Sequence, residues 1–249
     1  MKHTRLFSLL GLLLPLLFCS CPSTRTTLDF RSVQTKFNAA SSADNLAPEG
    51  GGTGSSAYKE VASALTDAYI KALAPELHAT AWMMRGVSEW RLGQLQQANT
   101  SAENGLGASP KPHTRDHVML TMLPGLVIDS DIVSQWKAAG KVYNATQYAE
   151  VERQYVTAFK RLDAAQNAFG AATDASVKNY HAYHKWRMLY NWQTIINKLV
   201  GGSSAVDAAI ESATSHFGHR DLLDVADAAR DTIPAGDPLR ELIRAKTGR

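Results

Sequence analysis

The spacing of apolar residues is the feature of this 249-residue sequence that most restricts its fold. In residues 146–169, Val151, Tyr155, Phe159 and Leu162 recur every three or four positions, which places them on one face of an α-helix. We find no convincing stretch of the strict alternation that is typical of a half-buried strand. The spacing therefore predicts an all-α fold.

Similar apolar spacing continues along most of the chain, and Gly, Pro or short polar turns separate the helical segments. The expected helices span residues 29–43, 56–73, 75–90, 95–106, 113–123, 124–139, 146–169, 174–200, 204–217, 221–231 and 237–246. Because consecutive helices joined by short turns lie antiparallel, we expect an array of helical hairpins in one domain over residues 29–249.

A glycine-rich segment at residues 48–56 interrupts this helical pattern. Its Gly-Gly-Gly-Thr-Gly run resembles a phosphate-binding loop only superficially. A phosphate-binding loop follows an apolar strand and closes with Lys-Ser or Lys-Thr, and both features are missing here. We expect a flexible linker.

The N-terminal residues have the composition of an export signal. Lys2 and Arg5 provide a basic start, and an apolar run follows over residues 6–18. About 13 apolar residues at roughly 1.5 Å each extend only about 20 Å, which is less than the roughly 30 Å needed to cross a bilayer. We therefore expect residues 1–20 to be a signal peptide rather than a membrane span.

The residues that end this run, Phe18-Cys19-Ser20-Cys21, resemble the lipobox of bacterial lipoproteins, although Leu is usual where Phe18 stands. The resemblance implies cleavage before Cys21 and covalent lipid on its side chain and new amino group, with no other cofactor. Two alternatives remain: cleavage without lipidation, and lipidation at Cys19.

Several acyl chains together give stable membrane anchoring, since each buried CH₂ contributes about 0.8 kcal/mol. Residues 21–28 would then be a lipidated polar tether. Pro22 stands where an Asp would favour retention in the inner membrane, so the resemblance implies an outer-membrane lipoprotein that faces the periplasm.

Charge and cysteine content exclude several classes of function. Removal of residues 1–20 takes away Lys2 and Arg5 and no acidic residue, which leaves 24 basic against 23 acidic residues. A nearly neutral chain gives no reason to expect nucleic acid as a partner. Both cysteines lie at the signal peptide junction, so an acylated mature chain has no thiol for catalysis, metal binding or a disulfide.

One segment, residues 79–112, resembles a tetratricopeptide repeat, a helix-turn-helix unit of about 34 residues. The matching residues are Trp82, Gly86, Gly93, Leu95, Ala98 and Pro110. The departures from the usual pattern are Arg85, Glu89, Ala102 and Gly105. The resemblance implies close helix approach at the small residues and an irregular tetratricopeptide-like array, since flanking segments echo the repeat only partly. A chance helical hairpin is the alternative.

The segment 174–200 is rich in aromatic residues and in histidine. Tyr180, His181, His184 and Trp186 are candidates for a ligand groove, and the two histidines share a helix face. No carboxylate lies one turn away, so we assign no metal site. Ordinary packing between helices is the alternative to a groove.

No enzyme signature occurs in the sequence, and we expect no catalytic residues. The expected function is a non-enzymatic scaffold or adaptor that binds an envelope protein or peptide. The alternative is a lipoprotein that binds a small ligand near residues 180–192 and delivers it to a transporter. A groove open to solvent beside Trp82, Arg85 and Glu89 would favour the scaffold function. A closed cavity at His181 and His184 would favour binding of a small ligand.

Overall fold

The computed structural model describes residues 22–46, 55–171 and 173–248. This part is 78% helical and contains no strand, which confirms the predicted all-α fold. An isolated β-bridge joins Tyr143 to Leu199. The predicted signal peptide, Cys21 and residues 47–54 of the glycine-rich segment lie outside the described residues.

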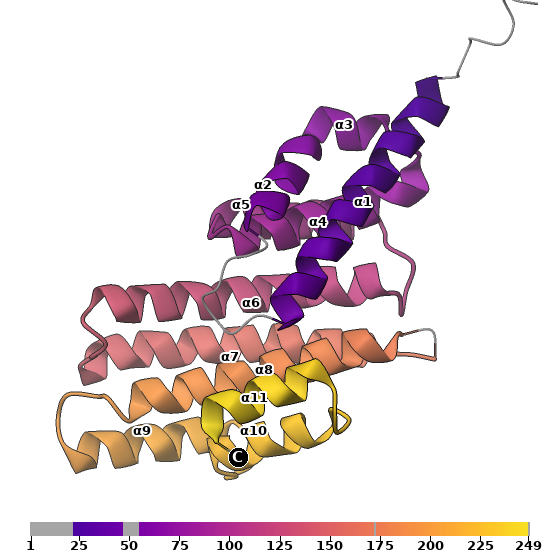
Figure 1. The fold of residues 1–249 in the computed structure, drawn as a ribbon. Coiled ribbons are helices and arrows are strands. Elements are labelled where there is room, and N and C mark those ends of the chain that lie inside the picture. The colour runs from indigo at the N-terminus through magenta and orange to yellow at the C-terminus, as the bar shows by residue number, and fades with distance from the viewer. Residues whose placement is uncertain (1–21, 47–54, 172, 249) are drawn as a thin grey trace, which may run out of the picture.

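The described elements follow one another as helices joined by short connections (Figure 1). Their bounds are α1 (Pro22–Leu46), α2 (Ser55–Ala64), α3 (Asp67–Ala72), the 3₁₀ turn Pro75–Leu77, α4 (His78–Arg91), α5 (Leu95–Gly107), α6 (Arg115–Ala138), α7 (Ala145–Asn167), α8 (Ala175–Ile196), α9 (Ser203–Ser215), α10 (Leu222–Asp231) and α11 (Pro238–Thr247).

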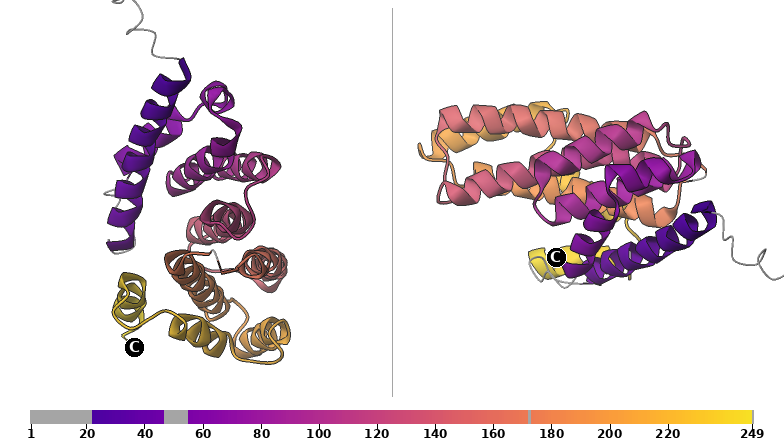
Figure 2. Two further views of the ribbon diagram at one scale, coloured as in Figure 1. Left: turned by 90° about the vertical axis from the view of Figure 1, so that its right-hand side faces the viewer. Right: turned by 90° about the horizontal axis from the view of Figure 1, so that it is seen from above.

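The helices pack mainly in pairs. Helix α4 packs on α5, and α6 packs on α7, whereas α8 packs mainly on α10. Helices α4, α6 and α8 also contact one another in a row. The view in Figure 2 (left) shows α1 and α11 one above the other along one side of the stack. These two helices touch each other, and they flank the row because α1 contacts α4 and α11 contacts α8.

Helix α6 differs from the sequence prediction, which placed a boundary at Pro124. The structure has one continuous helix with Pro124 in its interior. Proline removes a helical hydrogen bond, but this segment is buried against α7. A Cβ on Gly125 would lie 2.8 Å from Leu162 Cδ1 and 2.9 Å from the Ala158 carbonyl oxygen. The close contact between α6 and α7 keeps the helix intact.

Two other boundaries also differ from the prediction. Helix α1 begins at Pro22, so the predicted polar tether at residues 22–28 is helical. Proline suits the first turn of a helix because its φ is preset and no N–H is needed there. The predicted helix at 56–73 divides into α2 and α3, because Thr66 leaves the helical conformation and its hydroxyl caps α3 at Tyr69 N, 3.2 Å away.

Aromatic side chains form much of the core between α7, α8 and α9. The indole of Trp192 stacks on Tyr155 at 5.0 Å between ring centroids and on Phe159 at 5.9 Å. Asn144 and Gln147 form a capping box at the start of α7. This cap and the stacked rings fix α7 and α8, which support the residues of the candidate site.

Candidate functional site

A cleft of about 500 Å³ opens beside the row of α4, α6 and α8, and α11 completes its wall. We call it the inner cleft. Four of its described lining residues are cationic, one from each of these helices: Arg91, Lys137, Arg187 and Lys246. None of the described residues lining it is an Asp, Glu, His or Cys. The described lining of the inner cleft is therefore rich in cationic side chains.

A buried carboxylate positions Arg187. Asp129 on α6 is fully buried, and its Oδ2 lies 3.0 Å from a terminal guanidinium nitrogen of Arg187. The Asn191 amide also donates to Asp129 at 3.1 Å, and the Tyr155 hydroxyl donates at 3.4 Å. Burial, followed by the charge of Asp129, raises the pKa of Tyr155 well above its usual value. Arg187 is thus held in place from beneath the cleft.

On the α4 side of the inner cleft, neighbouring aromatic residues hold Arg91 in place. Its guanidinium lies 4.5 Å from the Trp90 ring centroid, and one terminal nitrogen donates to the Tyr180 hydroxyl at 3.2 Å. The Trp90 indole donates to Ser130 Oγ at 2.8 Å, which leaves the Ser130 proton available as a donor. The indole Nε1 of Trp136 is buried and has no hydrogen-bond partner in the described part of the chain.

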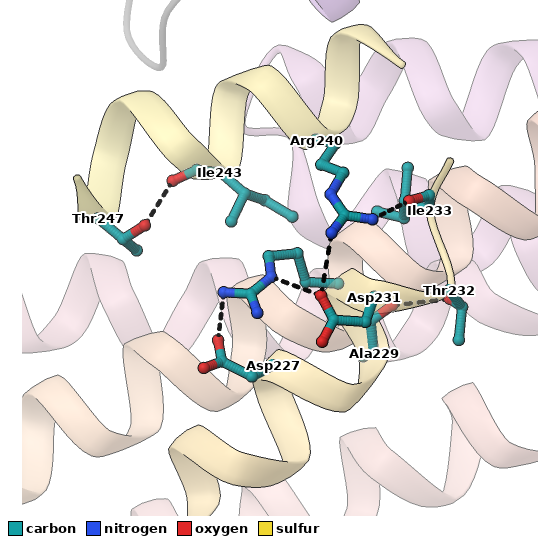
Figure 3. A network of polar contacts seen from close by, with 9 residues as sticks. Asp227, Ala229, Asp231, Thr232, Ile233, Arg240, Ile243 and Thr247 are labelled. Atoms are coloured by element: carbon teal, nitrogen blue, oxygen red, sulfur yellow. Dashed lines mark hydrogen bonds and ion pairs between the residues drawn. The ribbon is translucent and has the colours of Figure 1, made fainter. Parts of the chain in front are cut away.

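Polar contacts at the α10–α11 turn fix the position of α11 (Figure 3). Arg240 donates to the Ile233 carbonyl at 2.6 Å and to Asp231 Oδ1 at 3.2 Å. Arg230 donates to the same Asp231 oxygen at 3.0 Å. The turn carries α11 back to the inner cleft and places Lys246 at its edge.

The residues of the predicted repeat lie in the α4–α5 hairpin. Trp82 and Ala98 are buried, and Gly93 has a φ of +74° at the turn. A Cβ on Gly86 would lie 2.8 Å from Leu123 Cδ2 and 3.2 Å from Ser101 Cβ. A side chain at position 86 would therefore crowd both α5 and α6. The hairpin also contains Leu95 at the start of α5, and Pro110 follows it. Its assignment to the tetratricopeptide family stays a prediction.

Two departures from the repeat pattern form an internal ion pair. Arg85 Nε donates to Glu89 Oε1 at 2.8 Å, and Ser101 donates to the other Glu89 oxygen at 2.6 Å. Arg85 also pairs with Asp67 and donates to the Leu65 carbonyl. Glu89 is only 3% exposed. These side chains join α3, α4 and α5 rather than line an open groove.

The two histidines of the predicted groove have different surroundings. His181 Nε2 lies 2.9 Å from the Leu162 carbonyl oxygen, and burial lowers the pKa of His181. His184 is fully buried, and neither ring nitrogen has a hydrogen-bond partner in the described structure. Its ring instead makes edge contacts with Trp90 and Tyr180, at 5.5 Å and 4.4 Å between centroids.

The four candidate residues of α8 do not share one cavity. Trp186 is buried and stacks on Tyr190. Tyr180 lines a hollow beside α1, and His181 lines a different one between α8 and α10. The predicted groove of Tyr180, His181, His184 and Trp186 is therefore not formed as a unit. The adjacent residues Arg187 and Asn191 of the same helix face the inner cleft instead.

Other features limit the chemistry that the described residues offer. In residues 22–46, 55–171 and 173–248, no three His, Cys, Asp or Glu side chains gather where they could hold a metal ion. Helix α6 has the length and hydropathy of a membrane span, yet 56% of its most apolar 18-residue stretch is buried, as in the central helix of a folded domain.

No protein-family model, curated protein or solved structure matches the chain.

Proposed function

We propose that this chain is a lipid-anchored, non-enzymatic scaffold of the cell envelope, which binds a segment of another protein in the inner cleft. The observation that carries the proposal is the inner cleft itself, which is open to solvent and is built by four helices from distant parts of the sequence. Clefts between packed helices are common binding sites.

The residues of the cleft favour binding over catalysis. Its lining offers Arg, Lys, Ser, Thr and Asn side chains but no carboxylate, imidazole or thiol among the described residues. General acid–base catalysis uses groups whose pKa lies near the working pH, and His or a carboxylate usually fills this role. Hydrogen-bond donors and fixed cations instead suit recognition of a partner.

The sequence supports the location and the mode of anchoring. The lipobox resemblance at Phe18-Cys19-Ser20-Cys21 implies a lipid on Cys21 and an outer-membrane lipoprotein that faces the periplasm. The repeat resemblance at residues 79–112 supports partner binding, because helical repeat arrays generally present extended concave surfaces.

In-cell crosslinking tests this function. In one strain, a photoreactive amino acid replaces Ser134, which is exposed in the inner cleft. In a matched control strain, it replaces Lys160, which is exposed on α7 and does not line the cleft. We expect a discrete protein adduct from position 134 in intact cells and none from position 160. Equal adducts from both positions, or none from either, would contradict the proposal.

The volume of the cleft favours a small ligand as the second candidate. About 500 Å³ lies within the roughly 300–1,000 Å³ typical of small-molecule sites. If a small molecule is the natural occupant, small metabolites that copurify with the full-length protein should be lost from a Ser134→Trp variant, and the crosslink at position 134 should not form.

A further inference from the structure

We propose that the hollow between α8 and α10 is a second binding site, which takes a small carboxylate with an apolar body. We call this hollow, whose lining includes Lys178, Lys185 and Arg220, the outer hollow. Its volume of about 460 Å³ suits a small molecule, and none of its described lining residues also lines the inner cleft. The inference goes beyond the proposed function, because it concerns a different face of α8 and a different class of ligand.

Two packed helices build the outer hollow. Its lining residues recur every three or four positions on each helix: Lys178, Ala182 and Lys185 on α8, and Val225 and Ala229 on α10. Residues with this spacing share one face of a helix. Helices α8 and α10 also pack closely on each other. The outer hollow is therefore formed before any ligand binds, as most small-molecule sites are.

Positive charge is the first argument for an anionic ligand. Lys178 and Arg220 are exposed, and neither makes an ion pair in the described part of the chain. Lys185 Nζ lies 3.4 Å from Asp163 Oδ1, which is its ion-pair partner. None of the described lining residues is an Asp or Glu. After Asp163 is set against Lys185, the charges of Lys178 and Arg220 are left to attract an anion.

Other titratable groups close to the outer hollow in sequence do not change this balance within it. Asp174, Asp221 and Asp237 accept hydrogen bonds from backbone N–H groups at the starts of α8, α10 and α11. Asp224 is exposed on α10 but does not line the hollow. His181 lines it and is buried, and burial lowers the pKa of His181, so its ring adds no positive charge near neutral pH.

Apolar surface that reaches solvent is the second argument. Ala175 and Ala228 are exposed, Phe169 is half-buried, and all three line the outer hollow. The small alanine side chains leave space between the helices, and the Phe169 ring supplies an apolar wall. The exposed Thr232 hydroxyl adds a hydrogen-bonding group. A ligand with one carboxylate and an apolar body uses both kinds of surface, whereas an inorganic anion uses only the cations.

Titration with three matched compounds tests the class of ligand. The full-length protein in nonionic detergent is titrated with 4-phenylbutyrate, with the neutral 4-phenylbutanamide and with acetate, and binding is followed by calorimetry. We expect 4-phenylbutyrate to bind at millimolar concentration or below, and about tenfold more tightly than either of the others. The amide lacks the charge, and acetate lacks the apolar body. Binding of 4-phenylbutyrate should weaken as the salt concentration rises.

A bulky side chain in the outer hollow identifies the site. Ala228 is exposed on α10, so Ala228→Trp should fill the hollow and leave the fold intact, which circular dichroism checks. We expect this variant to lose binding of 4-phenylbutyrate. Ala208→Trp, at an exposed position of α9 outside the hollow, should bind it as the wild type does. Ser134→Trp, which alters the inner cleft, should also bind it normally.

Removal of the two unpaired cations tests the role of charge. We expect Lys178→Gln combined with Arg220→Gln to bind 4-phenylbutyrate about tenfold more weakly or worse. Lys160→Gln, at an exposed position of α7 that does not line the hollow, should bind it as the wild type does. Unchanged binding in the double variant would overturn the assignment of the ligand carboxylate to these cations.

Other results would overturn the inference as a whole. No binding of 4-phenylbutyrate at millimolar concentration, or equal binding of the amide or of acetate, would reject the class of ligand. Unchanged binding in Ala228→Trp, or a loss confined to Ser134→Trp, would place the compound outside the outer hollow. These results are separate from the crosslinking test, because a protein adduct at position 134 does not depend on the outer hollow.

Discussion

At the scale of single residues, His184 is unusual because its polar ring lies among aromatic side chains in the core. It is fully buried, and both ring nitrogens lack a hydrogen-bond partner in the described structure. Burial lowers the pKa of His184 well below its usual value, and the charges of Arg91, Arg187 and His181 lower it further. The neutral imidazole therefore serves as a packing group between aromatic rings.

The lowered pKa of His184 predicts how stability depends on pH. As the pH falls below about 6.5, the unfolded chain binds a proton that the folded chain does not, so the free energy of unfolding falls. This residue should contribute a loss of up to about 1.4 kcal/mol per pH unit. In urea unfolding from pH 8 to pH 5, His184→Leu should show a shallower decline than the wild type.

The neighbouring His181 provides the comparison for this prediction. At pH 8, His184→Leu should stay within about 1 kcal/mol of the wild type, because no hydrogen bond is lost. His181→Leu should cost about 1 kcal/mol, since it removes the contact with the Leu162 carbonyl. A His184→Leu variant with the same pH profile as the wild type would refute this account of His184.

At the scale of elements, the α4–α5–α6 contact depends on a glycine. A Cβ on Gly86 would approach Leu123 and Ser101 too closely, so Gly86→Ala must move a helix or a side chain. We expect it to lower the free energy of unfolding by about 1–3 kcal/mol. Gly107→Ala is the matched control, because no atom lies within 4 Å of its added Cβ and no positive φ is recorded there. Equal effects of the two substitutions in urea unfolding would contradict this explanation.

Local sequence signals predicted most helices because those helices depend on local chemistry. Asp174, Asp221 and Asp237 each cap the helix that follows, through a hydrogen bond to a backbone N–H, so these starts agree with the sequence to within one residue. The failure at Pro124 has a different origin. Proline predicts a boundary from local preference alone, whereas the packing of Gly125 against α7 keeps α6 continuous.

At the scale of the whole molecule, the inner cleft could not be predicted from the sequence. Its cations lie in four helices far apart along the chain, and only the stacking of those helices brings them together. The predicted groove is not formed as a unit for a related reason. Helical spacing places His181 and His184 on one face, but it does not show that neighbouring helices bury that face. Long-range packing decides both results.

Membrane attachment gives a prediction for the whole chain. In cells supplied with labelled palmitate, Cys21→Ser should abolish incorporation of label, because Cys21 occupies the position of the lipidated residue in the lipobox resemblance. Cys19→Ser should leave the chain labelled. Label that still enters Cys21→Ser while Cys19 is intact would move the modified residue to Cys19.

If a partner occupies the inner cleft in the cell, it shields the residues that line the cleft, and the reactivity of an introduced thiol measures this shielding. Both natural cysteines lie within residues 1–21, so a cysteine introduced elsewhere can be labelled selectively once their background is subtracted. Ser134→Cys reports on the cleft, and Thr157→Cys reports on an exposed position of α7 that does not line it.

Each variant is treated with maleimide in native membranes and again after purification in detergent. We expect Ser134→Cys to react more slowly in membranes than after purification, and Thr157→Cys to react at the same rate in both. Equal rates at position 134 in the two preparations, or protection confined to position 157, would contradict it.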